Sequence, residues 1–402
     1  MTDFEKTRHQ EFAASFSDRI ERHQRIVPII ATAVALLIGM MMLEFICRLL
    51  VPSAERNTVP TQALFTEYDP LYGWRLKKNY SGPSALSGPD RTTYSINSLG
   101  YRGAPMLGSL SMPRVLVVGE TTGFGLGVEE WQMFSQLLAD DLRRVLPNVE
   151  MVNLSVPGYS LDQELLVLEN EAKRYQPTVV ILLLSTDSIY SIQYPGHRML
   201  VADSITDYAK PYFVLAKDVH NSRVLTIENQ PPLENVSGEQ YQRWEQQYLP
   251  PTPLGVLGKY LKAAKYLDDS LKYINTEHFF GRPEVYPAYS PDSTNWQLML
   301  QLLYRFKDLS RTLRSFGIVA IIPAQETYTM TRVYPLAHYE LKNGCIQVQL
   351  QCIDLLNPIQ SAGGAALYAA QGNYLNQKGQ VILKDALKEK TQAILMNRAV
   401  SQ

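Results

Sequence analysis

The pattern of apolar and polar positions first sets residues 26–51 apart from the rest of the chain. Ile26–Leu43 is an unbroken run of apolar or small residues, and the apolar character resumes after Glu44 as far as Val51. A helix of this length rises about 39 Å, enough to cross a hydrocarbon core about 30 Å thick. The pattern predicts a transmembrane helix over 26–51 after a polar leader over 1–25. The alternative, a cleaved signal peptide, is disfavoured by the length of both segments.

The charges beside this segment predict its orientation. Arg19, Arg22 and Arg25 end the polar leader, and positively charged flanks stay on the cytoplasmic side of a membrane. We therefore expect a single-pass protein of the inner (cytoplasmic) membrane with a cytoplasmic N-terminus. In a Gram-negative cell, the main domain then lies in the periplasm.

Two charged residues interrupt the far end of the apolar segment. Glu44 and Arg48 are four residues apart, so they share one face of a helix near the outer membrane interface. One interpretation is an ion pair at that interface. The other is a contact with another membrane subunit, because charge close to lipid favours a partner. The sequence leaves both open.

Beyond residue 57 the hydrophobic spacing alternates between strand-like and helix-like. Short apolar runs predict strands at 115–118, 151–154, 179–184 and 318–322, and three- and four-residue spacing predicts helices at 132–146, 161–175, 296–315 and 379–398. Gly317 is expected to stop the third of these helices. Strands that alternate with helices predict an α/β domain over 57–402, a three-layer, doubly wound parallel sheet of flavodoxin-like type.

The alternation breaks between about 194 and 295. This stretch is rich in Tyr and Pro and contains one amphipathic pattern from Leu257 to Ile274. We interpret it as an insertion in the α/β domain. It either covers an edge of the sheet, or it docks a partner or shapes a cleft.

Composition excludes several classes of function. A net charge of -1 gives no concentrated basic face for nucleic acid. Three cysteines exclude a disulfide-built scaffold and a four-cysteine zinc cluster, and the sequence carries no cofactor signature. Cys345 and Cys352 are seven residues apart in the segment expected outside the membrane, where a local disulfide is favoured.

The turn after the first strand is the first candidate for chemistry. Ligands of open parallel sheets bind at the carboxyl ends of the strands, and Gly119–Gly125 follows the strand at 115–118. Thr121 is expected to present its hydroxyl there. The turn lacks the lysine and hydroxyl residue that end a phosphate-binding loop, and its glycines lack dinucleotide-binding spacing.

Several blocks in order resemble the SGNH/GDSL hydrolases, in particular their membrane-anchored bacterial branch. Beyond the anchor, the blocks are Asp69–Trp74, Ile96–Arg102, Val117–Val128, Asn153–Ser160, Ile322–Glu326 and Leu367–Gly379. The resemblance covers roughly 26–190 and 296–400. It implies the three-layer fold and the chemistry of ester hydrolysis.

The resemblance also implies which positions would carry that chemistry. The nucleophile position falls on Thr121, the glycine donor of the oxyanion hole on Gly158 and its asparagine on Thr186. The aspartate and histidine of the last block fall on Gln371 and Tyr374. Only the glycine is retained.

These replacements predict a catalytically degenerate site. Tyrosine, with a reference pKa near 10, is a poor base at neutral pH, and glutamine has no charge to stabilise an imidazolium. His338 is the least unsuitable replacement base, because its segment follows the strand at 318–322. The other histidines are expected to have structural roles, and none has metal-ligand spacing.

Three hypotheses follow from the sequence. The first is a non-catalytic, membrane-anchored scaffold or accessory subunit of a membrane protein complex, for example a photosynthetic or respiratory one. The second is an esterase or O-acetyltransferase that acts on cell-envelope polysaccharide through Thr121. The third is a carbohydrate-binding pseudoenzyme.

Overall fold

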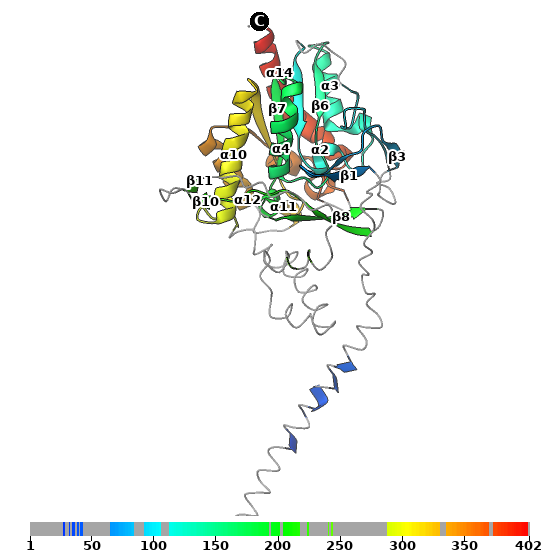
Figure 1. Cartoon of the computed structure of the whole chain (residues 1–402), viewed down its shortest axis with the longest axis vertical. Helices are drawn as coiled ribbons and strands as arrows, with labels where there is room; N and C mark the ends of the chain where they lie inside the picture. The colour runs from blue at the N-terminus through cyan, green and yellow to red at the C-terminus, as the bar shows by residue number, and fades with distance from the viewer. Residues whose placement is uncertain are drawn as a thin grey trace, which may run out of the picture. The chain divides into compact units, whose positions relative to one another are not determined.

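The computed structural model describes one α/β fold and a few isolated positions outside it (Figure 1). The described residues are 27–28, 32, 34–36, 38–39, 41–42, 65–83, 92–105, 112–192, 194–201, 204–217, 223–224, 240, 243, 288–329, 335–369 and 373–400. No helix within these ranges is long and apolar enough to cross a membrane. The leader, most of the predicted membrane segment, Glu44, Arg48 and Gln371 lie outside them.

Five parallel strands form the central sheet. Their bounds are β5 (Arg114–Val118), β6 (Glu150–Asn153), β7 (Val179–Ser185), β12 (Phe316–Ile322) and β13 (Gln351–Asp354). The spatial order is β6-β5-β7-β12-β13, so the second strand along the chain lies outside the first. This is the flavodoxin-like 2-1-3-4-5 order. Every residue of β5 and β7 is buried, as expected for strands covered on both faces, and the predicted parallel α/β sheet is confirmed.

The strand residues alternate between two hydrophobic cores. Leu116 and Val118 of β5 face one core, and Val115 and Val117 face the other. The first core is closed by α4 (Leu161–Glu171), α10 (Thr294–Thr312) and α12 (Pro335–Val348), and the second by α3 (Phe134–Arg143), α13 (Leu356–Ala362) and α14 (Gln377–Val400). Figure 1 shows α4 and α10 side by side over the first face. The fold therefore has three layers.

The expected helix stop at Gly317 is wrong. Helix α10 ends at Thr312, and Arg314 takes the left-handed conformation with φ 55°. Gly317 lies inside β12, where a Cβ atom would stand 2.7 Å from Ser310 Oγ. The glycine is thus required for close packing of the strand against the preceding helix, and a different residue makes the turn.

The segment after β12 also differs from expectation. The sequence places His338 in a loop, whereas it lies in α12, the helix that leads to the edge strand β13. A disulfide joins Cys345 near the end of this helix to Cys352 in β13. The bond fixes the helix-to-strand connection.

Smaller elements surround the sheet. Two antiparallel hairpins precede it, and two more lie within the predicted insertion, namely β1–β2 (Thr66–Asp69, Gly73–Leu76), β3–β4 (Ser81–Pro83, Thr93–Ser95), β8–β9 (Gly196–Val201, Ser204–Ala209) and β10–β11 (Ala216–Lys217, Arg223–Val224). Short helices fill the connections: α2 (Thr121–Phe124), η2 (Glu130–Gln132), η3 (Ala172–Arg174), α5 (Ser188–Ser191), α11 (Glu326–Thr329) and η5 (Gly364–Leu367).

Candidate functional site

The candidate site lies where β5 and β7 end side by side. These are the first and third strands along the chain, and the second lies on the outer side of the first. The connections therefore leave in opposite directions from the two strand ends, which makes this the switch point of the sheet, where open α/β sheets bind their ligands. Glu120 and Thr121 follow β5, and Thr186 and Asp187 follow β7.

Thr121 begins α2 directly after the strand. The turn is tight, because a Cβ atom on Gly123 would lie 2.3 Å from Ser155 Oγ. The Gly158 amide donates a hydrogen bond to Thr121 Oγ1 at 3.2 Å, and Gly158 has φ 80°, which favours glycine. Two positions that the sequence assigns to the site thus meet. Among the described side chains, none accepts a hydrogen bond from the Thr121 hydroxyl, so Thr121 has no visible base.

Thr186 is buried and held by the backbone around it. Its Oγ1 accepts a hydrogen bond from the Ala324 amide at 2.9 Å, and its carbonyl accepts one from the Tyr289 hydroxyl at 2.6 Å. Its own amide donates to the Ile322 carbonyl at 3.0 Å. The Thr186 side chain therefore ties the ends of β7 and β12 together.

The last block reaches the same turn. The Leu375 amide donates to Thr122 Oγ1 at 3.4 Å, and the side-chain amide of Gln380 donates to the Thr122 carbonyl at 3.0 Å. Tyr374, at the expected histidine position, is buried. The fold brings Thr121, Gly158, Thr186 and the Tyr374 segment to one end of the sheet.

Asn373 makes a connection that the sequence did not predict. Its Nδ2 donates to the Asp187 carboxylate, and its Oδ1 accepts from the Gln325 amide at 2.7 Å. One side chain therefore joins the last block to the ends of β7 and β12. No spacing rule links residue 373 to 187, so only the fold reveals this bridge.

Acidic side chains gather near these strand ends. Burial, together with the neighbouring Asp187 carboxylate, raises the pKa of Glu120 to about 8. Glu164, in the first turn of α4, is 3% exposed, and its Oε2 has no hydrogen-bond partner. Burial lifts the pKa of Glu164 well above its usual value, and the charges of Glu120 and Asp162 add to the shift. Both glutamates hold their protons more tightly than free carboxyl groups do.

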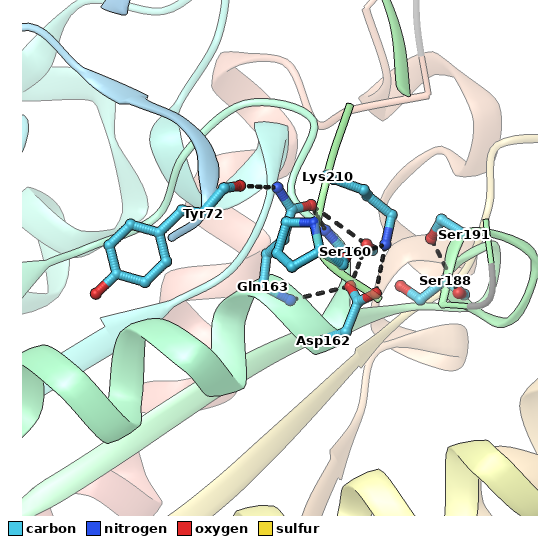
Figure 2. Close-up of polar contacts among 8 residues, drawn as sticks. Tyr72, Ser160, Asp162, Gln163, Ser188, Ser191 and Lys210 are labelled. Atoms are coloured by element: carbon cyan, nitrogen blue, oxygen red, sulfur yellow. Dashed lines mark hydrogen bonds and ion pairs between the residues drawn. The ribbon is translucent and has the colours of Figure 1, made fainter. Parts of the chain in front are cut away.

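A buried ion pair lies at the first turn of α4 (Figure 2). Lys210 follows β9, and its ammonium group contacts the Asp162 carboxylate and donates to the Pro211 carbonyl at 3.2 Å. The Ser160 hydroxyl donates to the other carboxylate oxygen, which also accepts from the Gln163 amide at 2.9 Å. Burial raises the pKa of Asp162 and lowers that of Lys210, and their mutual attraction opposes both shifts.

His338 is not a base for Thr121. Its Nε2 lies 2.5 Å from Asp354 Oδ1, and its side chain is fully buried. Burial lowers the pKa of this imidazole. The pair stands at the end of β13, three strand spacings or about 14 Å from β5. The side chains of the other five histidines lie outside the described part of the chain.

No metal centre is formed by the part of the chain that the structure describes. Within it, no three His, Cys, Asp or Glu side chains come together as ligands.

Comparison with known proteins bears on the fold. No protein-family model and no curated protein matches this sequence. Among solved structures, TesA is similar at 12% identity over 70% of this chain and 99% of its own, with a TM-score of 0.39. A member of the lipolytic G-D-S-L family from Veillonella parvula is similar at 11% identity over 69% and 98%, with a TM-score of 0.36.

A third similar structure is a catalytic mutant of Axe2, an acetylxylan esterase from Geobacillus stearothermophilus. It is 12% identical over 68% of this chain and 92% of its own, with a TM-score of 0.35. Likeness of this degree concerns the arrangement of helices and strands and says nothing of activity. Of these three structures, one is from the lipolytic G-D-S-L family and another is an acetylxylan esterase.

Proposed function

We propose that this protein is a catalytically degenerate, membrane-anchored SGNH-like protein that serves as a non-catalytic scaffold or accessory subunit of a membrane protein complex. The observation that carries the proposal is the state of Thr121. Its hydroxyl accepts a hydrogen bond from Gly158, and no described side chain takes its proton. A hydroxyl nucleophile without a base is weak at neutral pH.

The neighbouring positions support the same conclusion. Thr186 and Asn373 hold strand ends together through hydrogen bonds to the Ala324 and Gln325 amides. Tyr374 is buried at the position where a histidine would be needed. Side chains that are engaged in structural hydrogen bonds are not free to transfer protons. We infer that these residues hold the loops after β7 and β12 together instead.

The proposed location rests on the sequence and on one bond. The apolar run over 26–51 supports an anchor in the inner membrane, and the Cys345–Cys352 disulfide supports an oxidising compartment such as the periplasm for the folded domain. In such a place the α/β domain is available to other membrane subunits.

The first experiment measures ester hydrolysis by the full chain in mild detergent. With p-nitrophenyl acetate and acetylated xylan, we expect rates equal to those of Thr121→Ala and of a control, Ser188→Ala. Loss of a triad member lowers turnover by about 10⁴-fold in working hydrolases. Turnover by the wild type that disappears only in Thr121→Ala would overturn the proposal.

A second experiment tests the partner directly. Membranes are solubilised in mild detergent, the protein is isolated by an affinity tag, and co-purifying proteins are identified by mass. We expect other membrane proteins in a fixed ratio. Recovery of the protein alone, as a monomer or dimer, would contradict the subunit role.

One observation favours the esterase as a second candidate. Thr121 remains partly exposed, and the Gly158 amide lies within hydrogen-bond distance of its Oγ1, so a backbone donor for an oxyanion stands next to the nucleophile position. If hydrolysis is found, this arrangement makes Thr121 the first residue to test as the nucleophile.

A further inference from the structure

A pocket of about 200 Å³ lies beside the edge strand β6, and Thr121 is not among the residues that line it. Its walls come from the loop between Arg102 and Pro105, from η2 and α3, and from β6 itself. Pockets for drug-sized ligands measure about 300–1,000 Å³, so this one suits a smaller molecule. The pocket belongs to the α/β fold and is separate from the candidate site at the ends of β5 and β7.

Two buried polar side chains, Ser135 and Asn153, form one wall of the pocket. Asn153 Nδ2 donates to the Gly123 carbonyl at 2.7 Å and to Ser135 Oγ at 3.1 Å, and its Oδ1 accepts from the Ser155 amide at 3.1 Å. These bonds fix the Asn153 amide and use the Ser135 oxygen as an acceptor. No described residue accepts a hydrogen bond from the Ser135 hydroxyl, so its proton is left for a ligand.

A buried positive charge stands in a second wall. Arg102 is 2% exposed, and its guanidinium lies 4.5 Å from the ring centroid of Tyr94 and 5.1 Å from that of Phe124. It donates to the carbonyls of Phe124, Gly125 and Val128, its Nε has no partner, and no described carboxylate forms an ion pair with it. Burial lowers the pKa of Arg102 to about 10, so it remains charged at neutral pH. A buried charge without a counterion is costly, and an anionic group in the pocket would offset part of that cost.

An unpaired negative charge lines the same pocket. Glu130, in η2, is partly exposed, and its carboxylate has no ion-pair or hydrogen-bond partner among the described residues. It influences Arg102 electrostatically without forming an ion pair with it. Glu150, the other acid of the lining, is paired with Arg114, whose Nε lies 2.7 Å from Glu150 Oε2. The pocket thus presents one cation and one anion that do not neutralise each other by contact.

The ligand that fits these walls carries both charges. A simple anion would be repelled by Glu130, and a simple cation by Arg102. A zwitterion avoids both penalties, because its carboxylate faces Arg102 and the Ser135 hydroxyl while its ammonium group faces Glu130. Arg143, at the end of α3, adds guanidinium donors beyond the one that contacts Asp140 at 3.2 Å.

We propose that the pocket formed by Arg102, Glu130, Ser135 and Arg143 binds a small zwitterion, namely a free α-amino acid. Its carboxylate lies toward Arg102 and Ser135, and its ammonium group lies toward Glu130. This site goes beyond the role proposed above and does not depend on it. Arg102 and Asn153 also bind carbonyls of α2, so a ligand in this pocket contacts the side chains that support the turn of the candidate site.

The probes are the twenty standard amino acids, added singly to the full chain in mild detergent. A thermal melt identifies those that stabilise the protein, and titration calorimetry measures their affinity. We expect saturable binding of at least one amino acid. Absence of binding by all twenty overturns the proposal.

Blocked forms of the bound amino acid test the need for both charges. The N-acetyl derivative lacks the ammonium group, and the amide derivative lacks the carboxylate. Each should bind at least about tenfold more weakly than the free amino acid, because a charge-assisted hydrogen bond is lost. If either derivative binds as tightly as the free amino acid, the site recognises a single charge and the proposal is wrong.

Variants locate the ligand in this pocket. Glu130→Gln should weaken binding of the amino acid about tenfold and leave that of its N-acetyl derivative within twofold, because only the ammonium contact is removed. Asp292→Asn, which removes an exposed carboxylate elsewhere, should change neither affinity by more than twofold. Equal weakening by the two variants, or unchanged binding in Glu130→Gln, would overturn the proposal. Thermal melts without ligand verify that both variants are folded.

Discussion

Two buried carboxyl groups in the first turn of α4 have opposite surroundings. Asp162 faces Lys210, the Ser160 hydroxyl and the Gln163 amide, so each carboxylate oxygen is occupied. Glu164, two residues on, faces other acids and leaves Oε2 without a partner. The same helix turn thus carries one carboxyl group with a partner on each oxygen and one with an unpartnered oxygen.

The difference shows that a neighbouring cation decides whether a buried carboxyl group is ionised. Desolvation raises the pKa of both groups, but Lys210 and Ser160 oppose the shift of Asp162, whereas neighbouring carboxylates increase that of Glu164. Asp162 is stabilised as an anion and Glu164 as a neutral acid. The first group holds the structure together, and the second stores a proton.

The largest expected effect comes from removing the cation. Lys210→Met leaves Asp162 buried and uncompensated, which typically destabilises a protein by about 3–5 kcal/mol. Urea unfolding followed by circular dichroism measures the free energy of unfolding. The double variant Lys210→Met with Asp162→Asn should recover part of the lost free energy of unfolding, because the buried charge is then removed as well. A loss below about 1 kcal/mol would mean that the pair adds nothing beyond its cost of desolvation.

The protonated glutamates predict a pH dependence of stability. Above about pH 4.3 the unfolded chain releases protons that Glu120 and Glu164 still hold in the fold, Glu120 until about pH 8. The folded state therefore binds more protons, so the free energy of unfolding falls as the pH rises from 5 to 8. The slope reaches at most about 1.4 kcal/mol per pH unit for each proton.

Glu164→Gln tests this dependence. The variant keeps the shape of the side chain and removes its titration, so the denaturation midpoint should vary less between pH 5 and pH 8 than in the wild type. Asp292→Asn is the control and should leave the slope unchanged. An unaltered slope in Glu164→Gln would show that this carboxyl group is ionised in the folded protein.

A smaller effect is expected at Ser160. Its hydroxyl donates to Asp162, and its amide donates to Gln163 Oε1 at 3.2 Å. Ser160→Ala removes only the hydroxyl contact and should lower the free energy of unfolding by about 1–2 kcal/mol. Thermal melts at pH 7 suffice. If Ser160→Ala lowered the free energy of unfolding as much as Lys210→Met, the Ser160 hydroxyl would be the main group that stabilises the Asp162 carboxylate.

Long apolar segments were predictable from the sequence, and polar edges were not. The runs at β5, β7 and β12 are buried throughout or nearly so. Their apolar pattern identifies each of them as a strand and locates it in the sequence. The edge strand β13 reads Gln-Cys-Ile-Asp and is only partly buried. With apolar contacts on few positions, neither this strand nor α12 before it has a clear period.

The site was predictable as far as it follows local motifs. The turn at Thr121, Gly158 and the segment of Tyr374 come together at one end of the sheet, where the order of the blocks places them. Lys210 comes from a stretch without periodicity, and its partner lies 48 residues away. Such pairings depend on how the insertion hairpin packs, which no local pattern encodes.

The Lys210 contact also limits how the protein can be trimmed. A shortened chain that removes the insertion to give a minimal α/β domain would discard the lysine along with β8 and β9, and leave Asp162 facing an empty space. Such a truncation should retain residues through Pro211, or replace Asp162 by asparagine at the same time. The start of the insertion is therefore part of the domain's interior rather than a removable appendage.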